Sequence, residues 1–152
     1  MITSVTNEIH RFLQLHAQEL QDDKISLANR YLTDYEKYMQ VINFVNNYTK
    51  TLEKCIDRLD ISPGEHVPPF VIIGSMVEVQ DALTQKQRML IISEPGSEPP
   101  SAAENVQYET ISFLSDLGKS LLFKAVGQNL KIEEDGMACI GTIERINYNL
   151  NL

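Results

Sequence analysis

The first 62 residues contain neither proline nor glycine, and this absence constrains the fold of the chain more than any other feature. Both residues interrupt helices, so a run of this length without them favours continuous helix. Apolar residues recur along it at alternating spacings of three and four: Tyr38, Val41, Val45, Tyr48, Leu52, Cys55 and Leu59. Upstream, Leu13, Leu20 and Leu27 recur every seven residues. Such a repeat is typical of a coiled coil, so the segment predicts two helices packed along one seam.

The two helices are expected to fold back on each other as an antiparallel hairpin. One register aligns three apolar layers, which are Leu13 with Leu52, Leu20 with Val45 and Leu27 with Tyr38. It places the turn at residues 32–36, where Thr33 and Glu36 have the spacing of a capping box. A competing turn at Gln21–Lys24, followed by a helix cap at Ser26, would interrupt the upstream repeat. We prefer the first turn because all three layers agree on it.

The predicted turn carries two carboxylates, Asp34 and Glu36, with Asp22 and Asp23 lower on one arm. Each arm would be roughly 40 Å long, so the turn projects away from the rest of the chain. Two interpretations of the tip stay open. The carboxylates can simply stabilise a helix N-terminus through its dipole. They can also be delivered to a magnesium ion, which takes oxygen ligands.

A segment rich in proline and glycine, residues 60–69, separates this helical domain (1–62) from a second domain (67–152). The second domain predicts a small sheet with one helix over 115–125, capped by Ser115. The expected strands are 76–82, 87–93, 106–112, 130–133 and 137–146. A loop is expected at 94–101 and a hairpin turn at Asp135–Gly136. The fold class is therefore α+β.

Composition excludes several classes of function. The chain has a net charge of −8 and no basic cluster, so we expect no direct binding of nucleic acid. No membrane-spanning run and no secretory signal are visible, which predicts a cytoplasmic protein. Cys55 and Cys139 belong to no paired-cysteine motif, and the three histidines form no ligand cluster with them. We expect no catalytic residues, no metal site of the protein's own and no cofactor.

Four segments of the second domain, in order along about eighty residues, resemble the C-terminal domain of the Gre family of transcription elongation factors. They are Val71–Val79, Ile111–Leu122, Val126–Gln128 and Ile140–Ile146. The first has the family's valine, glycine, serine and alternating valines. The second is similar to the family's serine-proline-leucine-glycine helix. A helical hairpin followed by this domain is also the order of the family.

The resemblance implies an FKBP-like sheet without prolyl-isomerase activity. It implies RNA polymerase as partner, with the hairpin inserted in the secondary channel and the second domain docked at its rim through Ser115, Asp116, Leu117 and Gly118. Nucleic acid would be approached only through the polymerase. In cleavage-competent members, tip carboxylates help to hold the second magnesium of the polymerase, which then hydrolyses a backtracked transcript.

The sequence departs from the family pattern at the tip and at the docking helix. The glycine-aspartate-leucine-x-glutamate-asparagine tip is absent, and Asp34 and Glu36 are two residues apart instead of three. Asp116 stands where the family has proline. The hairpin is also about ten residues shorter. Two alternatives follow: a noncleaving competitor of Gre factors, resembling the Rnk-type proteins, or a coiled-coil interaction module for another protein.

Overall fold

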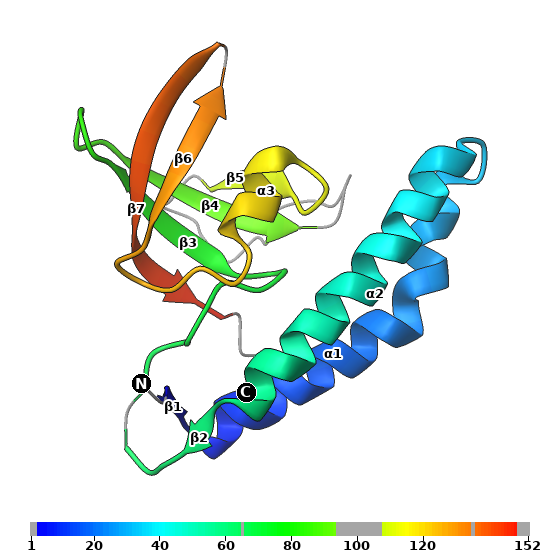
Figure 1. The fold of residues 1–152 in the computed structure, drawn as a ribbon, viewed down its shortest axis with the longest axis horizontal. Coiled ribbons are helices and arrows are strands. Elements are labelled where there is room, and N and C mark those ends of the chain that lie inside the picture. Colours follow the sequence, from blue (N-terminus) through cyan, green and yellow to red (C-terminus); the bar gives the residue numbers. More distant parts are fainter. Residues whose placement is uncertain (1–2, 65, 94–107, 135, 149–152) are drawn as a thin grey trace. The chain divides into compact units, whose positions relative to one another are not determined.

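A computed structural model describes residues 3–64, 66–93, 108–134 and 136–148. The chain divides into two compact units, Met1–His66 and Val67–Leu152. The first is helical and the second is built on a β-sheet with one helix (Figure 1). The predicted α+β fold is confirmed. In the described part of the chain, no helix is long and apolar enough to cross a membrane.

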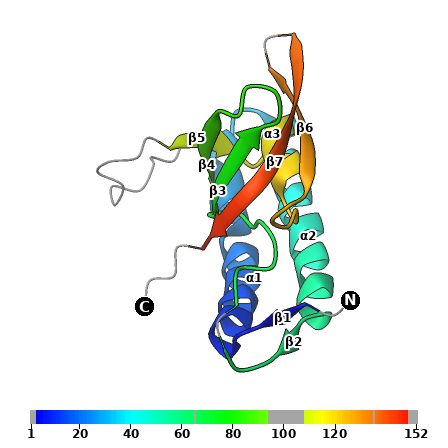
Figure 2. The same ribbon diagram turned by 90° about the vertical axis from the view of Figure 1, so that its left-hand side faces the viewer.

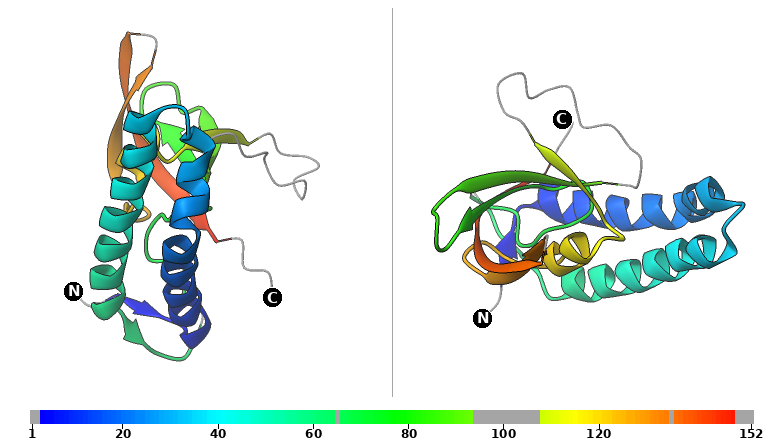
Figure 3. Two further views of the ribbon diagram at one scale, coloured as in Figure 1. Left: turned by 90° about the vertical axis from the view of Figure 1, so that its right-hand side faces the viewer. Right: turned by 90° about the horizontal axis from the view of Figure 1, so that it is seen from above.

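The first unit is an antiparallel hairpin of two long helices (Figure 3). Helix α1 (Asn7–Ala28) leads through a 3₁₀ turn, η1 (Asn29–Tyr31), into α2 (Tyr35–Asp57). The hydroxyl of Thr6 begins α1 by accepting from the Ile9 amide at 3.1 Å. The competing turn at Gln21–Lys24 is wrong, because those residues lie inside α1 and preserve its seven-residue repeat.

In two of the three predicted layers of the seam, Leu13 with Leu52 and Leu20 with Val45, both residues are buried, whereas Tyr38 of the third layer is only partly buried. Leu13, Leu20 and Leu27 are buried on α1. The buried residues on α2 are Val41, Val45, Tyr48, Thr49, Leu52 and Ile56. Near its end the seam therefore passes to Ile56 instead of Cys55, which is partly exposed. A straight helix drifts relative to a strict seven-residue repeat, so a shift by one position after several turns is expected.

A short parallel strand pair closes the open end of the hairpin, and the sequence did not predict it. Strand β1 (Ser4–Val5) pairs with β2 (Asp60–Ile61). The ladder extends by bonds from the Asp60 amide to the Thr3 carbonyl at 2.9 Å and from the Ser62 amide to the Val5 carbonyl at 3.1 Å. Strands of two residues are too short to show any periodicity. The pair ties the start of α1 to the end of α2.

The second unit is a five-stranded sheet in the order β5-β4-β3-β7-β6, and Figure 2 shows the strands side by side in this order. Its strands are β3 (Met76–Asp81), β4 (Gln87–Ser93), β5 (Glu109–Ser112), β6 (Asn129–Glu134) and β7 (Met137–Asn147). Pairing is antiparallel except between β4 and β5, which run parallel. Each predicted strand is present. The predicted loop 94–101, Asp135 and the first residues of the strand 106–112 lie outside the described residues.

The helix α3 (Asp116–Leu121) is shorter than the predicted 115–125. After Leu122 the backbone leaves the helix, and Phe123 takes a positive φ of 67°. The Phe123 amide then bonds to the Val71 carbonyl at 2.8 Å, and the Val71 amide bonds to the Lys124 carbonyl at 2.9 Å. These two tertiary bonds satisfy backbone groups that a longer helix would otherwise satisfy. The apolar pattern of 115–125 therefore predicted a longer helix than the one that forms.

The core of the second unit includes the segment before β3. Val71, Ile72 and Ile73 are buried together with Val77 and Val79. The sheet bends at a register shift between Glu78 and Val79 where β3 pairs with β7. Bulges of this kind increase local twist, which curves the sheet over its core.

Candidate functional site

The tip of the hairpin is formed by Leu32, Thr33 and Asp34. The Asp34 amide bonds to the Tyr31 carbonyl at 2.9 Å, which closes the turn. Asp34 has an extended backbone, and its Oδ1 accepts from the Lys37 amide at 3.2 Å. Asp34 is therefore the N-cap of α2. The prediction of Thr33 as the cap is wrong by one residue, because aspartate is a stronger N-cap than threonine and stands at the next position.

Capping gives the two tip carboxylates different roles. One oxygen of Asp34 is bonded to the backbone, whereas Glu36 lies exposed in the first turn of α2. Negative charge in this turn is favourable because the helix dipole places partial positive charge there. Asp34 thus stabilises the start of the helix through one oxygen, while both carboxylates are exposed at the tip.

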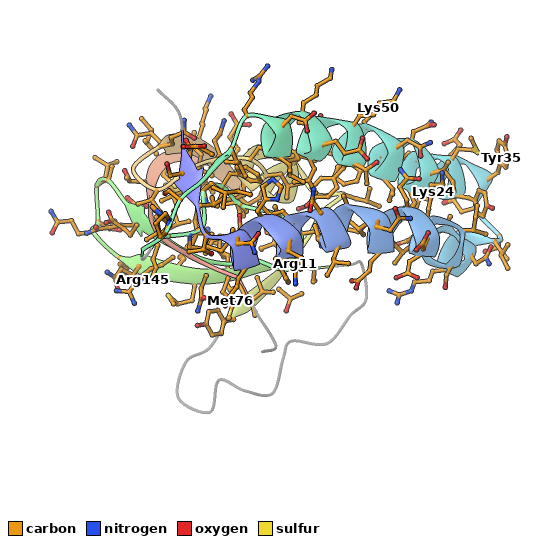
Figure 4. The ribbon with its side chains drawn as sticks, turned by 90° about the horizontal axis from the view of Figure 1, so that it is seen from below. Arg11, Lys24, Tyr35, Lys50, Met76 and Arg145 are labelled. Carbon is orange, nitrogen blue, oxygen red and sulfur yellow. The ribbon has the colours of Figure 1, made fainter. Side chains whose placement is uncertain are left out.

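Two large apolar side chains accompany these carboxylates. Leu32 is 72% exposed and Tyr35 is 74% exposed. Figure 4 shows Tyr35 at the turn end of the hairpin. The Lys37 ammonium lies 5.5 Å from the centroid of the Tyr31 ring, so a cation-π contact holds this lysine against the turn. The tip therefore combines a carboxylate with exposed apolar surface.

Within the described ranges, no group of three or more histidine, cysteine, aspartate or glutamate side chains could hold a metal ion. Asp22 and Asp23 are exposed on α1, and the Asp22 carboxylate accepts from the Gln18 amide at 3.0 Å. Asp34 and Glu36 could contribute ligands to a metal held mainly by another molecule. That role stays a prediction.

Polar contacts across the seam position the tip relative to the base of the hairpin. His16 Nε2 lies 2.8 Å from the Tyr48 hydroxyl. Burial lowers the pKa of His16 from 6.5 to about 4. The ring is therefore neutral at pH 7. The ring stacks on Phe12, at 6.4 Å between ring centroids, and meets the Tyr48 ring in a T-shaped contact at 5.8 Å. Both geometries are typical of a neutral aromatic cluster.

A second polar layer lies closer to the tip. Gln21 Nε2 donates to Thr49 Oγ1 at 2.6 Å, and Lys24 Nζ donates to Asn46 Oδ1 at 2.9 Å. Thr49 is buried and also donates to the Val45 carbonyl at 2.9 Å. Polar groups in a coiled-coil seam favour the register in which they find partners. The seven-residue repeat does not predict this layer, because the repeat is defined by apolar residues only.

The predicted docking residues Ser115–Gly118 form the start of α3. Ser115 Oγ donates to the Ser112 carbonyl at 2.6 Å and accepts from the Gly118 amide at 3.0 Å. Ser115 is thus the predicted N-cap, and it also fastens α3 to the end of β5. Ser112 was not predicted to take part, although a serine three residues before the cap was a visible signal.

Gly118 is buried because α3 passes very close to β5. A Cβ atom at this position would lie 2.1 Å from the Ser112 carbonyl oxygen, so no other residue fits without a shift of backbone. Asp116 is exposed and Leu117 is partly exposed. Of the four predicted docking residues, Ser115 and Gly118 fix how α3 packs on the end of β5, while the side chains of Asp116 and Leu117 reach solvent. Their docking role stays a prediction.

No protein-family model matches the chain, and no curated protein matches it. Among solved structures, it is similar to GreA factor homolog 1 (Gfh1) of Thermus thermophilus, at 16% identity over 97% of this chain and 99% of that chain, with a TM-score of 0.43. A GreA/GreB transcription elongation factor from Nitrosomonas europaea is 24% identical over 66% of this chain and 79% of that chain, with a TM-score of 0.44. Thermus aquaticus Gfh1 is 19% identical over 95% and 97%, with a TM-score of 0.43. At these identities and scores, the likenesses do not establish the family of this chain.

Proposed function

We propose that this protein regulates transcription elongation by binding RNA polymerase at its secondary channel, with the hairpin inserted and the second unit docked at the rim. The observation that carries the proposal is the arrangement of the Gre-like segments in the second unit. The segments Val71–Val79, Ile111–Leu122 and Ile140–Ile146 are far apart in sequence. In the fold the first and third segments become neighbours, because β3 pairs with β7. The second segment forms β5 and the close-packed start of α3.

The dimensions and charge of the hairpin support insertion into a protein channel. Helices of 22 and 23 residues are each about 33–35 Å long. Its seam is closed by apolar layers and by cross-helix hydrogen bonds, so it can keep its shape without a partner. The net charge of the chain opposes direct binding to nucleic acid and favours a basic protein surface. The partner would be the polymerase, in the cytoplasm, and nucleic acid would be approached only through it.

The capping role of Asp34 favours a noncleaving regulator over a cleavage-stimulating one. A pair of tip carboxylates that completes a metal site must direct both groups to one ion. Here one carboxylate is bonded to the α2 backbone, and the second is two residues away on the helix. The protein would then occupy the channel and compete with cleavage factors. It would have no catalytic residues of its own.

Binding of purified full-length protein to core RNA polymerase tests the proposal. We expect a saturable complex that a cleavage-competent Gre factor displaces. Replacing Leu117 by Arg should weaken the complex at least tenfold. The change puts a charged side chain in place of a partly exposed apolar one at the start of α3, where we propose that the polymerase docks. Lys119→Ala, an exposed position on the same helix, should bind like the parent protein. Absence of any complex at micromolar concentrations would contradict the proposal and favour a coiled-coil module for another partner.

A further inference from the structure

The two helices of the hairpin differ in the faces that they turn away from the seam. On α1 this face, here called the outer stripe, consists of Arg11, Leu15, Gln18, Asp22 and Ile25. Their alternating spacing of four and three keeps them on one side of a helix. They lie two positions from seam residues, which turns them about 200° away from the seam. All five are exposed, and Arg11 is labelled on α1 in Figure 4.

Two large aliphatic side chains lie on the outer stripe. Leu15 is 54% exposed and Ile25 is 52% exposed. They are ten residues apart, which is about 15 Å along the helix axis. Between them, Gln18 and Asp22 bond to each other at 3.0 Å, so the polar centre of the stripe is ordered. Aliphatic anchors separated by three turns of helix suit a protein surface that lies along α1.

Helix α2 has a matching outward face without these features. The equivalent positions are Gln40, Asn43, Asn47, Lys50 and Lys54, all exposed and all polar. Since both helices need solvent-facing residues, exposure alone does not explain why only α1 carries aliphatic ones. The difference between the faces indicates that α1 is the side of the hairpin that contacts a partner.

The charges on α1 restrict the chemistry of that partner. Its exposed charged residues are four acids and one base: Glu8, Glu19, Asp22, Asp23 and Arg11. The remaining cation, Lys24, is bonded to Asn46 and Gln21 in the seam. A nucleic acid or a second copy of α1 would bring negative charge against negative charge. A basic protein surface with aliphatic side chains complements both the negative charge of α1 and its exposed aliphatic side chains.

We infer that the outer stripe of α1 is the face by which the hairpin binds a basic, aliphatic surface of RNA polymerase. The inference rests on the proposed function, because it names the polymerase as the occupant. It adds that contact is made along one helix, by Leu15 and Ile25 within a border of acids, and that the outward face of α2 stays in solvent.

Two pairs of matched variants of the full-length protein test the inference. Leu15→Ala/Ile25→Ala removes the anchors, and its control is Asn43→Ala/Asn47→Ala on α2. Glu19→Gln/Asp23→Asn removes two negative charges beside the stripe. Its control is Asn43→Lys/Asn47→Lys, which changes the net charge by the same amount on the other helix. All substituted positions are exposed, so equal melting temperatures by circular dichroism should show intact folding.

The readout is the dissociation constant for core RNA polymerase, measured by fluorescence anisotropy at two salt concentrations. We expect both α1 variants to weaken binding about tenfold or more, with the charge variant also less sensitive to salt. Both α2 controls should stay within about threefold of the parent. If the parent binds and the α1 variants match the controls, the inference is wrong while the proposed function stands. If the parent does not bind, both are wrong. A dimer that Leu15→Ala/Ile25→Ala dissociates would assign the stripe to a second copy and overturn the inference.

Discussion

His16 Nε2 lies 2.8 Å from the hydroxyl oxygen of Tyr48, and this contact joins the two helices of the hairpin in the middle of their apolar seam. Tyr48 is buried, and burial lowers the pKa of His16 from 6.5 to about 4. The folded hairpin thus holds a neutral ring that an unfolded chain would protonate below pH 6.5. The stability of the hairpin is therefore linked to pH through this residue.

We predict that the free energy of unfolding falls as the pH is lowered from about 6.5 to 4. In that window the unfolded state binds a proton at His16 that the folded state excludes, so protons favour unfolding. Above 6.5 neither state is protonated and the contribution is constant. Between pH 7 and pH 5 the loss from this residue should be about 1–2 kcal/mol. Urea denaturation at several pH values, followed by circular dichroism, measures it.

Variants without the titrating ring separate this effect from the titration of carboxylates. His16→Gln should lower the stability at pH 7 but have a flatter pH dependence between 6.5 and 4. Gln14→Ala, at an exposed position on the same helix, leaves His16 in place and should keep the parent slope. An unchanged slope in His16→Gln would show that the depressed pKa of His16 is not the source of the pH dependence.

Replacing Leu20 or Val45 by Ala should destabilise the hairpin by roughly 2–4 kcal/mol. Leu20 is 7% exposed and Val45 is fully buried, so truncation leaves a cavity in the seam. Leu15→Ala on the same helix should lose less than about 1 kcal/mol, because Leu15 is already half exposed. Chemical denaturation of the three variants checks the difference. Equal losses at Leu15 and Leu20 would contradict the placement of the seam.

Gly118→Ala should destabilise the second unit by about 2–4 kcal/mol. The added methyl group would meet the Ser112 carbonyl oxygen at 2.1 Å, and both partners are backbone that cannot move independently. The shift would also disturb the bonds of Ser115 to Ser112 and Gly118. Lys119→Ala, its exposed neighbour, should stay within about 0.5 kcal/mol of the parent. Thermal unfolding of both variants measures the effect, and a neutral Gly118→Ala would mean that α3 packs less closely on β5.

The sequence predicted the hairpin because its signal is periodic and long. Three layers, including Leu20 with Val45, agreed on one register, and no proline or glycine opposed it. The strands of the second unit were also predictable, because turn residues separate short apolar runs. The early end of α3 was missed because it depends on a tertiary contact. The pairing of Val71 with Phe123 and Lys124 ends α3 early, and no local pattern encodes that pairing.

The sequence predicted which residues lie at the candidate sites but not what each residue does there. The acids at the tip were visible, yet only the fold shows that Asp34 caps α2 while Glu36 does not. Likewise, Ser115 and Gly118 matched a family motif, and the fold explains both by their contacts with Ser112. The outer stripe of α1 was overlooked because exposed apolar residues are noticed only when burial is known.

Because Asp34 caps α2 and Glu36 does not, variants can remove the negative charge of the tip while they keep the helix cap. Asn caps a helix about as well as Asp. Asp34→Asn should therefore keep the bond to the Lys37 amide while it removes the charge. Glu36→Gln keeps the size of an exposed side chain. The double variant Asp34→Asn/Glu36→Gln is expected to lose less than about 1 kcal/mol of stability and to bind core polymerase within a few-fold of the parent.

Transcript cleavage then tests what the tip does. If its carboxylates complete the second magnesium site, the parent protein should shorten the transcript of a stalled, backtracked complex, and the double variant should not. A metal ligand acts in the transition state and adds little to docking, so the loss should appear in the rate and not in the affinity. The capping role of Asp34 leads us to expect no shortening by either protein, and protection of the complex against a true cleavage factor by both. The control Asp22→Asn/Asp23→Asn, lower on α1, is compared at saturating protein concentration, because Asp22 belongs to the outer stripe, Asp23 lies beside it, and their loss should weaken binding. Shortening by the parent that survives in Asp34→Asn/Glu36→Gln but is lost in the control would move the active carboxylates from the turn to α1 and contradict the proposed tip.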